Sequence, residues 1–315
     1  MKFQSVNTYV VALVLVLLVP FVPVARAQSV GSQDKASQWK PVEDAMGRPG
    51  KLQSDGTFKF GMPRKDLNVI VAGTPIKPGL ALGSWTAFEG TRDHAMAMGD
   101  LVLTESEVEP VMMKLQEGGI QETAVHNHLL NESPRIMYMH IEGHGDAVQM
   151  ANAIHAALAL TNTPPPDPGS PAAATDQNIG IDTAQISSIL GHKGAVNGGI
   201  FQVSVPRAEK IMDEGMEVPP SMGTATALNF QPTGSGHAAI TGDFVLLPNE
   251  VNPVLKALRE NGIQVTALHS HMLNDQPHLL FMHFWANDDA VKLAKGLRAA
   301  LDKTKSKGGE TASKY

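Results

Sequence analysis

The stretch His126-Asn-His-Leu-Leu-Asn-Glu-Ser-Pro-Arg-Ile-Met-Tyr-Met-His140 decides the fold, because it recurs 143 residues later as His269-Ser-His-Met-Leu-Asn-Asp-Gln-Pro-His-Leu-Leu-Phe-Met-His283. In each copy two histidines stand two positions apart, and a third follows twelve residues after the second. The Asn and Pro between them are typical of a turn, so each copy predicts a β-hairpin.

The predicted register pairs His126 with His140 and His128 with Tyr138. Residues two apart on a strand share a face, so all three histidines lie on one side of the hairpin. Side chains directly opposed on antiparallel strands lie about 5 Å apart, close enough to share a ligand. The second copy repeats the arrangement with its own three histidines, His269, His271 and His283.

These hairpins belong to an internal duplication that organises the whole chain. Residues 99–142 and 242–285 align without a gap and are identical at 22 of 44 positions. The similarity extends upstream, where residues 47–64 resemble residues 191–207. Such identity at a fixed offset indicates two copies of one structural unit.

Each copy is expected to contain the same order of elements. These are a short helix (42–46; 186–190), a strand or hairpin (68–76; 210–218), a longer hairpin (85–103; 224–247), a helix (107–117; 250–260), the histidine hairpin and a last helix (146–160; 288–301). Strands mixed with helices and joined by short turns indicate an α+β fold: two tandem repeats, each a largely antiparallel sheet with two main helices. One continuous sheet shared by both copies is the alternative.

The rest of the chain divides around the two copies. The expected divisions are a signal peptide at 1–27, a disordered N-terminus at 28–37, the first repeat at 38–160, a Pro-rich linker at 161–179, the second repeat at 180–302 and a polar tail at 303–315. The linker prediction rests on its Pro-rich and Ala-rich composition, which is typical of a spacer that is stiff at its start.

The first 27 residues predict an exported protein. Lys2 gives a positive start, residues 9–24 are almost wholly apolar, and Ala25-Arg26-Ala27 fits a cleavage site before Gln28. An uncleaved N-terminal anchor is the alternative. We therefore expect a periplasmic or secreted protein with no membrane span after cleavage. The chain has no cysteine, so it relies on its core rather than on disulfides.

Charge and motifs exclude several function classes. Cleavage would remove two basic residues and leave a net charge of about −8, and there is no basic stripe of the kind that binds nucleic acid. The sequence also lacks a Gly-x-Ser-x-Gly nucleophile motif and a glycine-rich phosphate loop.

The repeated histidines favour metal binding. Imidazole is a common ligand of zinc and copper, and three protein ligands with one open position are typical of catalytic zinc. A fourth histidine also repeats and would share a strand face with an aspartate that could orient a ligand. The candidate ligands are His94, His126, His128, His140, His237, His269, His271 and His283, and the candidate orienting carboxylates are Asp100, Asp243 and Glu142.

Zinc is the expected ion, and copper or another divalent transition metal is less favoured. Thioether suits Cu(I), but the predicted register turns Met137 and Met139 away from His126 and His128. Histidines that only hydrogen-bond within a half-buried sheet are the structural alternative. We also expect the first copy to bind more tightly, because Glu142 is replaced by Trp285 in the second.

With these residues in hand, the chain resembles the LppY/LpqO family of bacterial envelope proteins, a family of unknown function. The resemblance rests on Gly-Asp-Leu-Val-Leu at 99–103, Glu-Val-Glu-Pro-Val at 107–111, the run ending in Val-His-Asn-His at 119–128 and the run from Pro-Arg-Ile-Met-Tyr-Met-His at 134–145. It implies an exported protein and no established activity or cofactor. Unlike the lipoprotein members, this chain has no cysteine for a lipid anchor.

The leading hypothesis is an exported protein that binds a divalent transition metal through its histidines. A non-metal envelope protein that binds a cell-wall or small organic ligand is the alternative. A metal-dependent hydrolase, with Asp100 or Glu142 beside a metal-bound water, is the third hypothesis.

Overall fold

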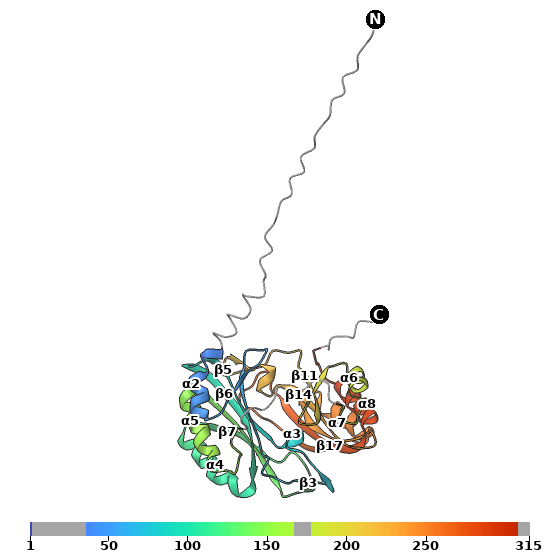
Figure 1. Cartoon of the computed structure of the whole chain (residues 1–315), viewed down its shortest axis with the longest axis horizontal. Helices are drawn as coiled ribbons and strands as arrows, with labels where there is room; N and C mark the ends of the chain where they lie inside the picture. The colour runs from blue at the N-terminus through green and yellow to red at the C-terminus, as the bar shows by residue number, and fades with distance from the viewer. Residues whose placement is uncertain (2–35, 167–177, 308–315) are drawn as a thin grey trace. The chain divides into compact units, whose positions relative to one another are not determined.

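The computed structural model describes Met1, residues 36–166 and residues 178–307. The predicted signal peptide after Met1, most of the N-terminal segment, the middle of the linker and the end of the tail lie outside the described residues. The described residues from Gln38 onward form one compact unit, which contains both repeats (Figure 1).

Each repeat forms its own six-stranded antiparallel sheet, so the alternative of one continuous sheet is wrong. The first sheet has, in order, β1 (Lys51–Leu52), β2 (Phe58–Pro63), β5 (Gly83–Thr91), β6 (His94–Thr104), β9 (Ile136–Gly145) and β7 (Gln121–His126). The second has β10 (Gly194–Asn197), β11 (Ile200–Pro206), β14 (Ala225–Gly234), β15 (His237–Leu246), β17 (Leu280–Asp289) and β16 (Gln264–His269).

Three helices cover one face of each sheet. They are α2 (Lys40–Met46), α4 (Glu105–Glu117) and α5 (Ala147–Leu158) in the first repeat, and α6 (Thr183–Leu190), α7 (Val251–Glu260) and α8 (Ala290–Leu301) in the second. Local signals begin these helices, as where the Asp146 carboxylate accepts a hydrogen bond from the backbone N–H of Gln149. The predicted α+β fold with two repeats is confirmed.

The central strands show how the layers are stacked. Along β6, Ala97 and Leu101 pack against the helices, whereas Met98 and Val102 point to the opposite face and contact the second repeat. A strand that is buried on both faces reads as a nearly continuous apolar run. The two sheets therefore lie between the two helical layers, with α2, α4 and α5 on one side and α6, α7 and α8 on the other (Figure 1).

Two segments cross from one repeat to the other. The first, arm 1, contains β3 (Ile70–Val71), β4 (Thr74–Pro75) and α3 (Pro78–Ala81). The second, arm 2, contains β12 (Met212–Asp213), β13 (Met216–Glu217) and the 3-10 helix η1 (Pro220–Met222). Arm 1 begins a few residues after β2 and arm 2 begins a few residues after β11, which are equivalent places in the two repeats.

Hydrogen bonds fix both arms on the opposite repeat. The backbone N–H of Lys77 donates to Gln231 Oε1 at 2.7 Å, and Gln231 Nε2 donates to the carbonyl of Pro75 at 2.8 Å. In the other direction, Lys59 Nζ donates to the carbonyl of Ser221 at 2.8 Å. The two repeats therefore exchange arms, and each arm brings side chains to the partner sheet.

The arms enclose two apolar cores between the sheets. The arm-1 core contains Val69, Val71, Ile76, Leu80, Leu82, Val102, Leu129, Ile136, Tyr138, Ile200, Ala239 and Trp285. The arm-2 core contains Ala87, Met96, Met98, Ile211, Val218, Met222, Val245, Met272, Leu279 and Phe281. Histidines of the two hairpins border both cores, since His128 stacks on Tyr138 of the arm-1 core and His271 stacks on Phe281 of the arm-2 core.

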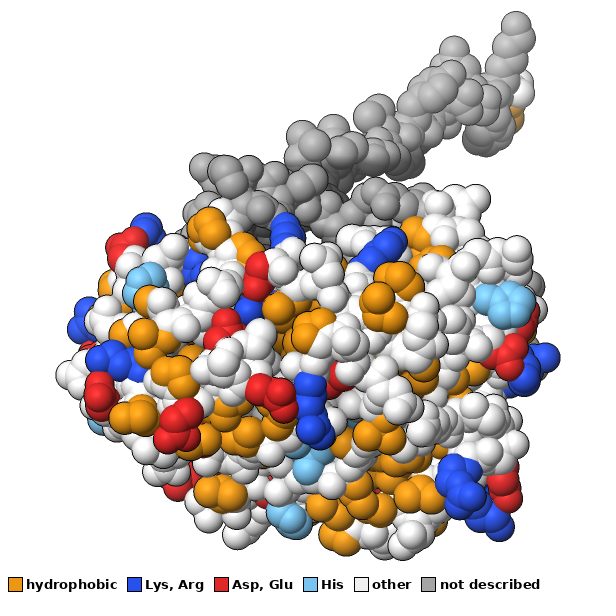
Figure 2. Space-filling model, turned by 90° about the horizontal axis from the view of Figure 1, so that it is seen from below, with side chains coloured by type: hydrophobic (Ala, Val, Ile, Leu, Met, Phe, Trp, Pro, Cys, Tyr) orange, Lys and Arg blue, Asp and Glu red, His pale blue; other side chains and the backbone are white. Residues whose placement is uncertain are grey.

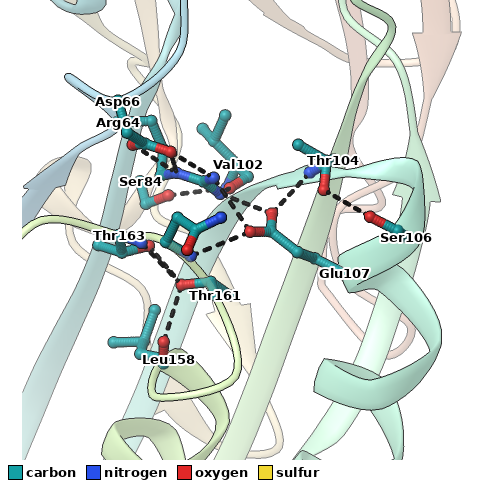
Figure 3. A network of polar contacts seen from close by, with 11 residues as sticks. Arg64, Asp66, Ser84, Val102, Thr104, Ser106, Glu107, Leu158, Thr161 and Thr163 are labelled. Atoms are coloured by element: carbon teal, nitrogen blue, oxygen red, sulfur yellow. Dashed lines mark hydrogen bonds and ion pairs between the residues drawn. The ribbon is translucent and has the colours of Figure 1, made fainter.

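In each repeat a buried arginine links the sheet to one covering helix through an ion pair with a glutamate. Arg64 donates to Glu107 through both terminal nitrogens, at 2.8 and 3.1 Å, and to the carbonyl of Val102 at 2.7 Å (Figure 3). Arg207 repeats the arrangement with Glu250 at 2.7 and 3.1 Å. Burial alone would raise the pKa of Glu107, but the hydrogen bonds from Arg64 and from backbone N–H groups outweigh it and lower that pKa.

Among the described residues, none of the helices combines the length and the apolar character that crossing a bilayer requires. Figure 2 shows acidic and basic side chains interspersed over one face, together with scattered apolar ones.

Candidate metal centre

Six histidines from the two repeats form one cluster between the sheets, here called the histidine centre. Three pairs of rings stack across the repeat boundary, with centroids 3.5 Å apart for His126 and His269, 3.7 Å for His128 and His283, and 3.6 Å for His140 and His271. The triads expected to form two separate sites are thus brought together in one.

The ligand atoms of these rings lie close enough to act on one ion. One nitrogen from each of His126, His128 and His140 lies within 4.8 Å of the others. The same holds for His126 with the three histidines of the second repeat, His269, His271 and His283. His126 therefore belongs to both sets.

The two hairpins place their histidines by a register that differs from the predicted one. His126 pairs with Tyr138 at the end of β7, and Ala124 pairs with His140, so the predicted register is wrong by two residues. The reason is the longer connection between β7 and β9, which includes β8 (Glu132–Ser133) paired with arm 1. A shift of two residues keeps every side chain on its face, so convergence is unaffected.

Aromatic rings flank the centre on both sides. His128 stacks on Tyr138 with centroids 3.4 Å apart, and His271 stacks on Phe281 at 3.5 Å. Tyr138 also donates its hydroxyl hydrogen to the carbonyl of Ala81 at 3.0 Å. These flanking rings restrict the orientations that the imidazoles can adopt.

An aspartate from each repeat faces the rings. Asp100 lies opposite His140 in the β6–β9 ladder, and Asp243 lies opposite His283 in the β15–β17 ladder. The carboxylate of Asp100 is 3.8 Å from His128 Nε2 and 3.9 Å from His140 Nε2. These distances exceed those of hydrogen bonds, so the predicted role of orienting a ring by a hydrogen bond is not observed.

Most ring nitrogens of the centre have no hydrogen-bond partner among the described residues. Both nitrogens of His126 are buried without a partner, and so is Nε2 of each of the other five rings, His128, His140, His269, His271 and His283. One oxygen each of Asp100 and Asp243 is in the same state. Buried polar atoms are nearly always paired in proteins, so a group of this size calls for a further binding partner.

Two of the rings show how Nε2 becomes available. His283 Nδ1 lies 2.9 Å from the carbonyl of Gly242, and His269 Nδ1 lies 3.3 Å from that of Ser270. A ring that donates its Nδ1–H to a carbonyl presents the bare lone pair of Nε2 at the opposite side. In His283 and His269 that nitrogen is buried without a partner among the described residues.

Burial determines the protonation of these groups. It lowers the pKa of His126 to about 3 and that of His269 to about 4, and it lowers the pKa of the other four imidazoles well below 6.5. Burial raises the pKa of Asp100 to about 8 against the opposing effect of Lys59, and raises that of Asp243 well above 3.8. The rings are therefore neutral at pH 7, which is the state that binds a metal.

A cavity of about 650 Å³ reaches the centre from between the sheets. Four of the histidines and both aspartates line it, His128, His140, His271, His283, Asp100 and Asp243. Its lining also includes Lys59 and neutral polar side chains such as Asn197, Gln202 and Asn229. Ligand sites in proteins are commonly concave spaces of this size.

Three predicted site residues lie elsewhere. His94 and His237 are exposed at the first residues of β6 and β15, six residues before the aspartates, or about 20 Å along an extended strand. Glu142 hydrogen-bonds with His144 at 2.9 Å and not with a ring of the centre. His94 and His237 repeat in the sequence as the other candidate ligands do, but they lie at the starts of their strands and therefore away from the centre.

The sequence did not reveal one further group of residues. His144 lies within β9 beside Glu142, and arm 2 brings Asp213 to both. The only available signal was the acidic pair at 213–214, which has no counterpart in arm 1. Spacing could not connect it to β9, because the contact depends on the exchange of arms.

Comparison with curated proteins and with solved structures gives no informative match. No curated protein matches the chain. The trimeric bacterial microcompartment shell protein PduB is 12% identical and matches 82% of this chain and 95% of its own, with a TM-score of 0.21. EtuB from Clostridium kluyveri is 8% identical and matches 80% of this chain and 90% of its own, with a TM-score of 0.19. Scores this low carry no argument about fold or function.

The family match covers both repeats. Residues 40–160 and residues 184–303 each match the family described as Domain of Unknown Function (DUF1259). Together these stretches make up more than half of the chain. The chain therefore belongs to this family and carries its domain twice.

Proposed function

We propose that the chain binds a divalent transition-metal ion, zinc above all, at one centre that both repeats build. The observation that carries this proposal is the convergence of seven buried imidazole nitrogens that have no partner among the described residues. A buried polar atom without a partner costs about 1–3 kcal/mol, so several together are strongly unfavourable unless a ligand binds them.

The donor set agrees with this ion. Zinc binds imidazole nitrogen at about 2.0–2.1 Å in tetrahedral geometry, which places two ligand nitrogens about 3.4 Å apart. Within each of the two sets, His126 with His128 and His140 and His126 with the three histidines of the second repeat, the ligand nitrogens lie within 4.8 Å of one another, so side-chain adjustments of the order of 1 Å would close a site. Copper is the second choice, because Met139 and Met282 lie in the helix-side cores, away from the rings.

The cavity supports a second candidate, the binding of a small organic ligand. Its lining holds four of the histidines together with amide and hydroxyl groups that can orient a ligand. A ligand with a carboxylate or hydroxyl group would reach a metal held by the centre. Hydrolysis of such a ligand is the third hypothesis, with Asp100 and not Glu142 beside the metal.

Export and the narrower relationship to the LppY/LpqO family belong to this proposal. Both rest on the sequence: export on residues 1–27 and the narrower family on the four motifs between residues 99 and 145. Mass spectrometry of the protein from the culture medium or periplasm tests export. A mature chain that begins at Gln28 is expected, and an intact N-terminus in the cytoplasmic fraction would contradict it.

Metal binding is tested by titrating the chelator-stripped full-length chain with zinc in competition with a coloured chelator. We expect uptake of at least one zinc per chain. The matched controls are His94→Ala and His237→Ala, which remove histidines that repeat in sequence but lie outside the centre; both should bind as the parent does. A stripped chain that takes up no zinc, copper or nickel would overturn the metal proposal and leave the organic-ligand candidate.

A further inference from the structure

A second polar cluster lies between the repeats, beside the arm-2 core. Glu142 and His144 come from β9 of the first repeat, and Asp213 comes from arm 2 of the second. One ligand atom from each of the three lies within 4.8 Å of the others. Glu214 adds a fourth group, with its carboxylate 3.7 Å from His144 Nε2. These four residues are here called the arm-2 cluster.

Asp213 is the least expected member of this cluster. It is 1% exposed, and neither of its carboxylate oxygens has a hydrogen-bond partner among the described residues. Glu142, only 7% exposed, lies against it. Burying a carboxylate without a partner is costly, and burying two together adds their mutual repulsion.

Only a proton or a cation can relieve that repulsion. In the described part of the chain, the ion pairs of Glu142 and Glu214 go to His144, and no lysine or arginine pairs with either acid or with Asp213. Burial, followed by the contact with Asp213, raises the pKa of Glu142 to about 8.

We propose that Glu142, His144 and Asp213 form a second divalent-cation site, distinct from the histidine centre. Three groups would bind the ion directly, and Glu214 would supply a fourth oxygen from the solvent side. Carboxylate ligands suit Mn²⁺, and one imidazole also suits first-row transition metals such as Zn²⁺. The oxygen-rich set therefore selects a harder ion than the six imidazoles do.

The cluster has a route to solvent that a binding site requires. The side chain of His144 is 27% exposed and that of Glu214 is 46% exposed, whereas Glu142 and Asp213 are closed in. An ion would enter past the two exposed groups and reach the two buried ones. The inner carboxylates would then be fixed by the sheet and by arm 2.

Only one such site exists in the duplicated part of the chain that the structure describes. The positions that correspond to Glu142 and His144 in the second repeat hold Trp285 and Asn287. Trp285 belongs to the arm-1 core together with Val71, the residue that occupies in arm 1 the place of Asp213. The site therefore depends on arm 2 lying against β9.

Electron paramagnetic resonance of Mn²⁺ added to the full-length, chelator-stripped chain tests this inference. We expect one bound Mn²⁺ per chain. Asp213→Asn keeps the shape of the side chain but removes its charge, and it should weaken Mn²⁺ binding at least about tenfold. Loss of a residue that merely orients a metal ligand already weakens metal binding by about 10–100-fold. His144→Ala should also weaken Mn²⁺ binding at least about tenfold. Because the His144 side chain is partly exposed, this variant should fold even if Asp213→Asn does not.

Controls separate this site from the histidine centre. Asn287→Ala, the equivalent change in the other repeat, should leave Mn²⁺ binding unchanged, and so should His283→Ala. If the parent chain binds no Mn²⁺, or if both Asp213→Asn and His144→Ala bind it as the parent does, the inference is overturned and the two carboxylates share a proton instead. Loss of Mn²⁺ in His283→Ala would also overturn it, because the ion would then belong to the histidine centre.

Discussion

The two inter-repeat cores occupy equivalent places, yet one borders a charged cluster and the other is apolar. In the arm-2 half, Glu142 of β9 meets Asp213. In the arm-1 half, the equivalent residues are Trp285 and Val71, which lie in one apolar core. Both arms have the same hairpin geometry, with Val71 and Asp213 at the same position before the turn. The difference therefore lies in side chains and not in backbone.

This difference shows which features a duplicated chain must keep. The histidine centre takes three rings from each repeat, so a change in either copy alters the same site. The Arg64–Glu107 and Arg207–Glu250 pairs support each sheet separately, and both copies retain them. The two cores beside the arms are separate sets of residues, so each can change without its counterpart. One half could therefore become a polar site while the other became a stabilising core.

The largest expected effect tests the part that both halves share. Arg64→Met and Arg207→Met should each lower the free energy of unfolding by about 4 kcal/mol, because each leaves a buried glutamate without its partner. Urea denaturation followed by circular dichroism measures this. A loss confined to one of the two variants would show that the two halves are not braced in the same way.

The second effect tests the part in which the halves differ. Trp285→Ala should lower the free energy of unfolding by about 3 kcal/mol, because it leaves a cavity in the arm-1 core. Glu142→Ala, at the equivalent position, should change the stability of the metal-free protein by less than about 1 kcal/mol, since it also removes a repulsion between carboxylates. Denaturation in the presence of a chelator compares them, and equal losses would remove the contrast between the two cores.

The smallest expected effect concerns the stability of the folded chain at acid pH. The pKa values of Glu107 and Glu250 are lowered in the folded chain, because hydrogen bonds from Arg64 and Arg207 outweigh the burial that raises them. A lowered pKa contributes stability that is complete above the ordinary value of 4.5 and is lost as the pH falls through the folded value. Glu107→Gln and Glu250→Gln should therefore each reduce the loss of stability below pH 4.5. An unchanged acid limb in both variants would contradict the shift.

Much of this fold follows from local signals in the sequence. The longer hairpins predicted at 85–103 and 224–247 contain nearly all of β6 and all of β15, and the predicted helices match α4, α5, α7 and α8 to within a few residues. The exchange of arms did not follow, because it rests on contacts between distant residues. Lys77 and Gln231, for example, are 154 residues apart and show no local pattern.

The candidate site was predictable only within each repeat. Two histidines at alternate positions lie on one face whatever the exact register, so the triads survived a register error of two residues. That His126 meets His269 depends on how two sheets stack, and spacing within one hairpin carries no information on it. Asp213 had still less signal, since its contact with Glu142 requires both the stacking and the exchanged arm.

The most direct test of the shared centre compares zinc binding by His140→Ala and His283→Ala, one change in each repeat. Both are made in the Asp213→Asn background, in which the arm-2 cluster should bind at least about tenfold more weakly. The account predicts that each single change weakens the binding of all zinc, by similar factors of at least about ten. If each variant instead kept half of the zinc at the parent affinity, the two repeats would hold separate sites and the single-centre account would be wrong.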